Sequence, residues 1–198
     1  MAKALNELKD ELRALLEAIG DAFSIALVGG LAVSVRTKPR FTHDLDFAVA
    51  VDSDAVAEQV VHHLIQRGFA LEATLENKRH GRLGTVRLRR VPDAPIVDLL
   101  FAAAGIEVEA VAAADPMTVL GQRVRVATIG HLIAFKLVSR DDKLRPQDVL
   151  DLHALTAAAD TEDWQVAEAT VRLIEHRGFG RSRDLHAALV EWRASSRS

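Results

Sequence analysis

Apolar side chains recur at intervals of three and four positions over residues 3–19, and the pattern stops at Gly20. This spacing predicts an amphipathic helix. Two apolar runs follow, at residues 24–28 and 44–51, and both are short enough for buried strands. A further helix is expected between them over residues 31–35, directly after a pair of glycines. The chain therefore begins as a mixture of helices and strands.

The middle of the chain continues this mixture, whereas the last third is helical throughout. The middle is expected to hold one helix from about residue 53 to 67, strands at 69–75, 84–91 and 95–101, and a hairpin at 118–126. The last third is expected to hold helices at 129–140, 146–158, 162–176 and 183–194. We therefore predict an α+β fold with two domains: a mixed β-sheet flanked by helices over residues 1–127, and a C-terminal helical bundle over residues 128–198.

Composition narrows the class of protein without identifying a function. The 198 residues are 49% hydrophobic, which is enough for a good core. The 25 basic and 28 acidic residues give a net charge of −3, so a contact with nucleic acid has to come from a local patch. Cysteine is absent, which excludes disulfides and thiolate metal sites. Without a signal-peptide pattern or a long apolar segment, we expect a cytoplasmic protein with no membrane partner.

Two acidic residues interrupt the apolar run that starts at residue 44. In an extended strand Asp44 and Asp46 point to the same face, where two carboxylates repel each other unless a cation lies between them. Mg²⁺ is usually held by one or two carboxylates together with substrate phosphates. Gly29 and Gly30, before this strand, allow the backbone to approach a phosphate closely. The combination predicts a metal-dependent nucleotide site, with Mg²⁺ as the ion and Mn²⁺ as the alternative.

A third carboxylate, Asp98, stands in the apolar segment at residues 95–101. A buried carboxylate needs a partner or a metal ion. If this segment is a neighbour of the acidic strand, three carboxylates converge, and such a cluster can hold two Mg²⁺ ions and deprotonate an attacking hydroxyl. The alternative is that Asp98 ends a strand and pairs with an arginine.

The helical part contains a second group of charged residues. On a helix Lys136 and Arg140 share a face, and Asp148 and Asp151 are likewise adjacent. Apolar neighbours of Lys136 suggest a half-buried stem, which suits a point contact to a β- or γ-phosphate. Asp148 could then orient Lys136 or Arg140 across the helix pair. The alternative is a set of interhelical ion pairs with no catalytic task.

A basic stretch without any acidic residue covers residues 78–90. It contains Lys78, Arg79 and Arg82, followed by Arg87 and Arg89 on one face of the expected strand. Such a patch could hold the phosphates of an RNA acceptor or of a nucleotide. The alternative is an edge strand whose charges protect it from pairing with other chains.

With these residues in hand, the chain resembles the nucleotidyltransferases of the polymerase-β-like superfamily, and within it the AbiEii/AbiGii-type toxin branch. The resemblance covers roughly residues 24–155. It rests on Val28-Gly-Gly-Leu-Ala32, on Arg40-Phe-Thr42-His-Asp44-Leu-Asp46, on Lys136-Leu-Val-Ser-Arg140 and on Arg145-Pro-Gln-Asp148-Val-Leu-Asp151-Leu.

The resemblance implies an enzyme that transfers a nucleoside monophosphate from an NTP to an acceptor and releases pyrophosphate. It further implies an RNA acceptor such as tRNA and a separate antitoxin protein as partner, since the chain would be the toxin of a toxin–antitoxin pair. The residues that it assigns to metal binding are Asp44, Asp46 and Asp98, those that it assigns to the nucleotide are Gly29, Gly30, Arg40, Thr42, Lys136 and Arg140, and Asp148 supports or performs catalysis. Leu31 stands where many members of the superfamily have Ser or Thr. This departure leaves a second interpretation open, a nucleotide-binding or antitoxin-like regulatory module that transfers nothing.

Overall fold

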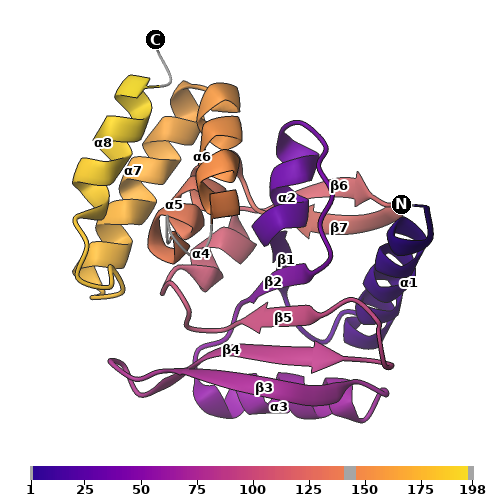
Figure 1. The fold of residues 1–198 in the computed structure, drawn as a ribbon. Helices are drawn as coiled ribbons and strands as arrows, with labels where there is room; N and C mark the ends of the chain where they lie inside the picture. The colour runs from indigo at the N-terminus through magenta and orange to yellow at the C-terminus, as the bar shows by residue number, and fades with distance from the viewer. Residues whose placement is uncertain (1, 141–145, 196–198) are drawn as a thin grey trace.

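The computed structural model describes residues 2–140 and 146–195, which form a seven-stranded sheet and the helices around it (Figure 1). The strands are β1 (Ile25–Val28), β2 (Leu45–Val49), β3 (Ala70–Asn77), β4 (Arg82–Arg89), β5 (Val97–Leu100), β6 (Asp115–Val119) and β7 (Gln122–Val126). The helices are α1 (Ala2–Ile19), α2 (Gly29–Arg36), α3 (Asp54–Ile65), α4 (Glu107–Ala112), α5 (Ile129–Ser139), α6 (Pro146–Ala158), α7 (Thr161–His176) and α8 (Leu185–Ser195). The predicted fold class, a mixed sheet flanked by helices and followed by further helices, is confirmed.

The acidic strand β2 lies in the middle of the sheet, whose order is β3-β4-β5-β2-β1-β7-β6. It pairs antiparallel with β1 and parallel with β5. In this register Asp46 is opposite Val28 on one side and opposite Asp98 on the other, and Asp98 is in turn opposite Arg87 of β4. Because directly opposite residues share a face of the sheet, the topology gathers these charged side chains beside the end of β1.

Most elements lie where the apolar pattern predicts them, with ends that differ by up to three residues, and three differences affect the site or the fold. Helix α2 begins at Gly29 itself and not at Leu31, and β2 begins at Leu45, so that Asp44 precedes the strand. The short helix α4 was not expected. It turns only Glu107, Ala110 and Val111 inward, which is too few positions to produce a helical period in the sequence.

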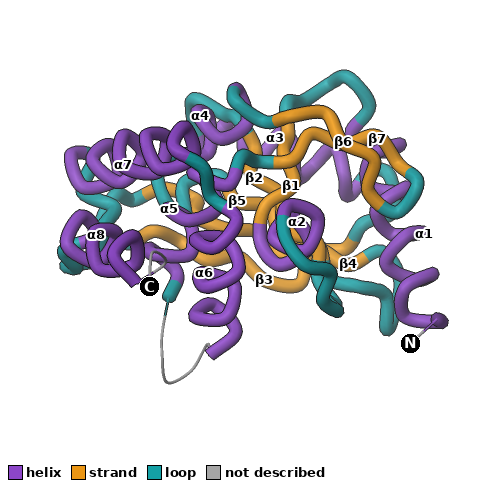
Figure 2. The backbone as a smooth tube through the Cα atoms, turned by 90° about the horizontal axis from the view of Figure 1, so that it is seen from above, coloured by secondary structure: helices purple, strands orange, loops and turns teal. Residues whose placement is uncertain are grey.

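Helix α5 is the central element of the C-terminal part. All its residues from Gly130 to Val138 are buried, as expected for a helix that is apolar all round. It contacts α6, α7 and α8 as well as α2, which lies against β1 and β2 (Figure 2). Buried residues from both sides of residue 127 form one hydrophobic core, and a division into two domains there stays a prediction. Within the described residues, no helix is long and apolar enough to cross a membrane.

Candidate active site

The turn between β1 and α2 is shaped around the carboxylate of Asp46. Gly29 adopts a φ of 63°, a left-handed conformation that favours glycine. A Cβ atom placed on Gly29 would lie 1.9 Å from Oδ2 of Asp46, so no larger residue fits without displacing the acid. The backbone of Gly30 forms a hydrogen bond with the same carboxylate. The glycine pair therefore lets the chain pass directly over Asp46.

Asp46 is a carboxylate whose charge is poorly compensated. Burial, supported by repulsion from Asp98 and Asp44, raises the pKa of Asp46 to about 6, although Lys136 and the Gly30 hydrogen bond act in the opposite direction. Among the described residues, no Lys, Arg or His nitrogen lies within 4 Å of this carboxylate. A cation or proton at this position would relieve the repulsion.

Asp46 lines a cavity of about 450 Å³ between the sheet and α5. The charged residues of its lining, within the part of the chain that the structure describes, are Asp46, Asp98, Arg87, Lys136 and Arg181. Leu100 of β5 and Leu132, Phe135 and Val138 of α5 supply an apolar surface beside them. A cavity of this size with a few polar groups and an apolar wall is typical of a small-molecule site. Here the polar groups suit phosphate and a metal ion, and the apolar wall suits a flat base.

Asp98 lies next to Asp46, but its carboxylate is paired with an arginine. Arg87 donates from Nε to Oδ1 at 2.9 Å and from Nη2 to Oδ2 at 2.7 Å. This two-point contact is the geometry in which guanidinium and carboxylate groups bind most strongly. Of the two alternatives for Asp98, the arginine partner is the one that the structure contains. In the described part of the chain, no group of three His, Cys, Asp or Glu side chains is arranged to hold a metal, so the three-carboxylate cluster expected from the sequence is not assembled.

Asp44 stands just ahead of β2 and lines a different hollow, of about 210 Å³, together with His43, Arg89 and Asp93. It is still near enough to Asp46 to contribute to the raised pKa of that residue. The two acids of the Asp-x-Asp pattern are thus electrostatically coupled. They do not face the same cavity.

The predicted contact between Lys136 and Asp148 is present and belongs to a larger buried network. Nζ of Lys136 lies 2.7 Å from Oδ1 of Asp148 and 2.8 Å from Oδ2 of Asp151. Asp151 also accepts two hydrogen bonds from Arg40, each of 2.7 Å. Burial alone would raise the pKa of Asp151, but the hydrogen bonds from Arg40 and Lys136 outweigh it and lower that pKa. The network ties α5 and α6 to the segment that leads into β2.

Arg40 and Thr42 lie beside Gly30 of the glycine turn, but neither of them is among the residues that line the cavity of Asp46. A Cβ atom on Gly30 would lie 2.8 Å from Nη2 of Arg40 and 3.0 Å from Oγ1 of Thr42. Arg140 is placed elsewhere: it follows the end of α5, and its guanidinium carbon lies 5.9 Å from the centroid of the Trp192 ring, outside the residues that line the cavity. Arg145, which belongs to one of the motifs noted in the sequence, lies outside the described residues.

The basic stretch at residues 78–90 divides into two parts. The strand arginines are paired with acids: Arg82 with Asp54, Arg87 with Asp98 and Arg89 with Glu72. The strand itself is not at the edge of the sheet, because β3 covers it, and the edge-strand interpretation is therefore wrong. Lys78 and Arg79, in the turn between β3 and β4, line a second cavity.

Sequence reasoning missed the partners that come from distant segments. Arg181, from the loop between α7 and α8, lines the cavity of Asp46, and no motif marks it. Asp151 was noted only as a neighbour of Asp148, although its bond to Arg40 links residues more than a hundred positions apart. An acid three residues after Asp148 on the same helix face was the available signal.

Comparison with known proteins identifies a family for the chain. Residues 10–196 match the model of a family described as nucleotidyl transferase AbiEii toxin, type IV toxin–antitoxin system. No sequence among curated proteins is significantly similar to this chain.

Several solved structures share the fold at low sequence identity. An antigenic nucleotidyltransferase-like protein from Paracoccidioides brasiliensis has a TM-score of 0.54 and 18% identity, with 93% of each chain covered. A candidate nucleotidyltransferase from H. pylori has a TM-score of 0.51 and 17% identity, over 100% of this chain and 94% of that one. The lincosamide antibiotic adenylyltransferase LnuA, solved with lincomycin bound, has a TM-score of 0.51 and 14% identity, over 78% of this chain and 97% of that one. At such identities the likeness concerns the fold.

Proposed function

The chain belongs to the AbiEii nucleotidyltransferase family, and from this premise we propose that it transfers a nucleoside monophosphate from an NTP to an RNA acceptor such as tRNA. The reaction depends on Mg²⁺, and the protein acts as the toxin of a toxin–antitoxin pair, with an antitoxin protein as its partner. The acceptor hydroxyl oxygen forms a bond to the α-phosphorus, the bond from that phosphorus to the bridging oxygen breaks, and pyrophosphate leaves. The hydroxyl proton passes to a base or to water.

The observation that carries the proposal is the half-buried carboxylate of Asp46 beneath the glycine turn. Its pKa of about 6 means that the folded chain holds a group that a cation would stabilise. Asp46 provides hard oxygen donors, and one carboxylate completed by substrate phosphates fits the preference of Mg²⁺. Asp44 lines the neighbouring hollow and would join the ion only after its side chain turned toward the cavity. The ion would neutralise the carboxylate of Asp46 and the phosphate oxygens and help the acceptor hydroxyl to lose its proton.

The remaining residues of the cavity bind and orient the nucleotide. The ammonium group of Lys136 lines the cavity and is fixed by Asp148 and Asp151, so it offers a positioned charge to a β- or γ-phosphate. Gly29 and Gly30 let the backbone approach the phosphates. The apolar wall formed by Leu132 and Phe135 suits the base.

The test is label transfer to RNA. Purified protein is incubated with each labelled NTP, Mg²⁺ and total bacterial RNA, and the RNA is separated on a gel. We expect labelled RNA with the unchanged chain and a loss on the order of 10³-fold in Asp44→Ala and Asp46→Ala, because metal and phosphate stabilisation contributes several kcal/mol to such transition states. Transfer at an unchanged rate in both variants would place the active site elsewhere.

A second candidate function is a module that binds a nucleotide without transferring any part of it. The contact between Asp98 and Arg87 favours this candidate, because Arg87 occupies the carboxylate that could have been a third metal ligand. Calorimetric binding of an NTP without release of pyrophosphate in the presence of RNA would support that candidate.

A further inference from the structure

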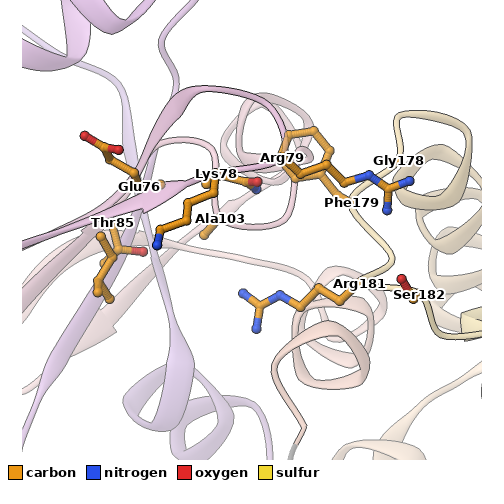
Figure 3. A pocket seen from close by; sticks show the side chains of 12 residues that line it. Glu76, Lys78, Arg79, Thr85, Ala103, Gly178, Phe179, Arg181 and Ser182 are labelled. Carbon is orange, nitrogen blue, oxygen red and sulfur yellow. The ribbon is translucent and has the colours of Figure 1, made fainter.

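A second cavity, of about 460 Å³, lies between the turn that joins β3 to β4 and the loop that joins α7 to α8. Figure 3 shows the side chains of Lys78 and Arg181 reaching from opposite sides into this space. Arg79 lines the cavity too, and Glu76 is the acid among the lining residues. Among the described residues that line this cavity, three side chains are cationic and one is acidic, so this part of the lining carries net positive charge, although the whole chain is acidic.

This cavity adjoins that of Asp46. Leu75, Thr85, Ala103 and Arg181 line both of them. A molecule held in the second cavity therefore has a short path to the carboxylate of Asp46 and to Lys136. The arrangement is what a transferase with two substrates requires: separate sites that meet at the reacting atoms.

The backbone at the shared wall is held in an uncommon conformation. Arg181 and Ser182 have φ values of 52° and 62°, which non-glycine residues adopt rarely and at an energetic cost. The loop is also tied to the opposite turn, because the ring of His80 stacks on Phe179 with centroids 3.9 Å apart and His80 lies 3.3 Å from the carbonyl oxygen of Gly178. These interactions fix the loop opposite Lys78.

The same interactions limit what the cavity can recognise. Phe179, the aromatic residue of its lining, is stacked on His80 and packs against the backbone of Gly105, where even a Cβ atom would come within 2.5 Å of the ring. The ring is therefore engaged and does not offer a free face for stacking a base. What the cavity presents to a ligand is positive charge, which selects for anionic groups and repels cationic acceptors such as polyamines.

We propose that this cavity is the acceptor site and that Lys78 and Arg181 bind a backbone phosphate of the RNA strand whose end reaches Asp46. The inference deepens the proposed function, on which it rests, by naming the residues that hold the acceptor and the part of it that they bind. Because they bind phosphate and not a base, recognition at this point is independent of sequence.

The test is binding of a short, fluorescently labelled single-stranded RNA of mixed sequence to the full chain, without NTP or Mg²⁺, at several KCl concentrations. For Lys78→Ala/Arg181→Ala we expect affinity at low salt to fall at least about tenfold, and the slope of log K against log salt to flatten by about 0.7 for each phosphate that the variant no longer binds. The matched control is Arg172→Ala, which removes an exposed arginine on α7 whose partner is Glu168 and which should leave affinity and slope unchanged.

Three results would overturn the inference. One is equal RNA binding by the double variant and the unchanged chain, and another is an equal loss of affinity in Arg172→Ala. The third is displacement of the RNA by free NTP from the unchanged chain but not from the double variant, which would assign Lys78 and Arg181 to the nucleotide. The binding assay contains no metal, and NTP is added only for the displacement measurement. A negative binding result therefore does not decide the label-transfer test of the proposed function, and a failed transfer does not change the binding result.

Discussion

The carboxylate beside the end of β1 and the carboxylates of the helix pair α5–α6 have opposite electrostatic surroundings. Asp46 is held under the glycine turn with a raised pKa and with no cationic group of the described chain in contact. Asp151 is more fully buried, yet it is bound by both Arg40 and Lys136, and its pKa is lowered. The same side-chain chemistry thus produces an unstable charge in one place and a stable one in the other.

The difference separates a binding group from a supporting group. A carboxylate that the fold leaves without a cation lowers stability, and such groups are found where a ligand or metal compensates them. The charge of a carboxylate with two cationic partners is already compensated, and the role of such a carboxylate is to hold those partners in place. From this comparison we expect Asp46 to bind a ligand or metal ion, and Asp151 and Asp148 to position Lys136.

The largest effect on stability is expected for Lys136→Met. The substitution removes the ammonium group that faces Asp148 and Asp151, and breaking a buried ion pair on one side is expected to lower the free energy of unfolding by about 3 kcal/mol or more. Urea unfolding followed by circular dichroism measures it. The matched control is Lys3→Met, whose ion pair with Glu7 on α1 is exposed and should contribute less than about 1 kcal/mol. Equal stability of the two variants would show that the network is not structural.

The next largest effect on stability is expected for Asp46→Asn, and it is an increase. The pKa of Asp46 is about 6 in the folded chain and 3.8 in the reference state, so folding takes up a proton between these pH values. The free energy of unfolding therefore falls as pH rises from about 4 through 6, and the penalty is complete above that. Asp46→Asn removes it, and we expect the variant to be more stable than the unchanged chain at pH 7.5 by up to about 3 kcal/mol.

The measurement is chemical unfolding of both proteins at pH 4.5 and pH 7.5 in buffer with a metal chelator. The advantage of Asp46→Asn should shrink at the lower pH, where the acid of the unchanged chain is largely neutral. A variant that is less stable at both pH values would mean that the carboxylate is compensated in the folded chain, and the contrast with Asp151 would fail.

Local pattern was sufficient to predict the fold class and the closeness of Gly29 to Asp46. Strand, glycine turn and acidic strand follow one another along the chain, so the position of Asp46 near Gly29 depends only on short-range geometry. Helix α4 could not be found in the same way, because it is six residues long and Glu107 stabilises its start by accepting hydrogen bonds from the backbone of Ala103 and Ala104. These hydrogen bonds lie in the turn before α4, and they produce no helical period in the sequence.

The partners of the charged residues depended on register and on distant segments. Whether Asp98 meets a metal or an arginine is decided by the pairing of β4 with β5, which places Arg87 opposite it. A shift of one residue would have turned Arg87 to the other face. Arg181 reaches the cavity only because α7 and α8 pack on α5. Contacts of this kind form only in the assembled fold, so local sequence pattern cannot predict them.

The smallest expected effect is the difference in stability between two alanine variants, which separates backbone strain from contact with the acid. In Gly29→Ala the new Cβ atom both adopts a left-handed conformation and overlaps the carboxylate of Asp46. Gly20→Ala is the matched control, since Gly20 has a φ of 52° but nothing lies within 4 Å of an added Cβ atom, so it bears only the conformational cost of about 1–2 kcal/mol. Urea unfolding of both variants should show an additional loss of about 1 kcal/mol or more for Gly29→Ala, and label transfer should fall in that variant alone. Equal unfolding free energies and equal transfer would mean that the carboxylate yields without consequence, and that the close fit of Gly29 to Asp46 is not what holds the acid in place.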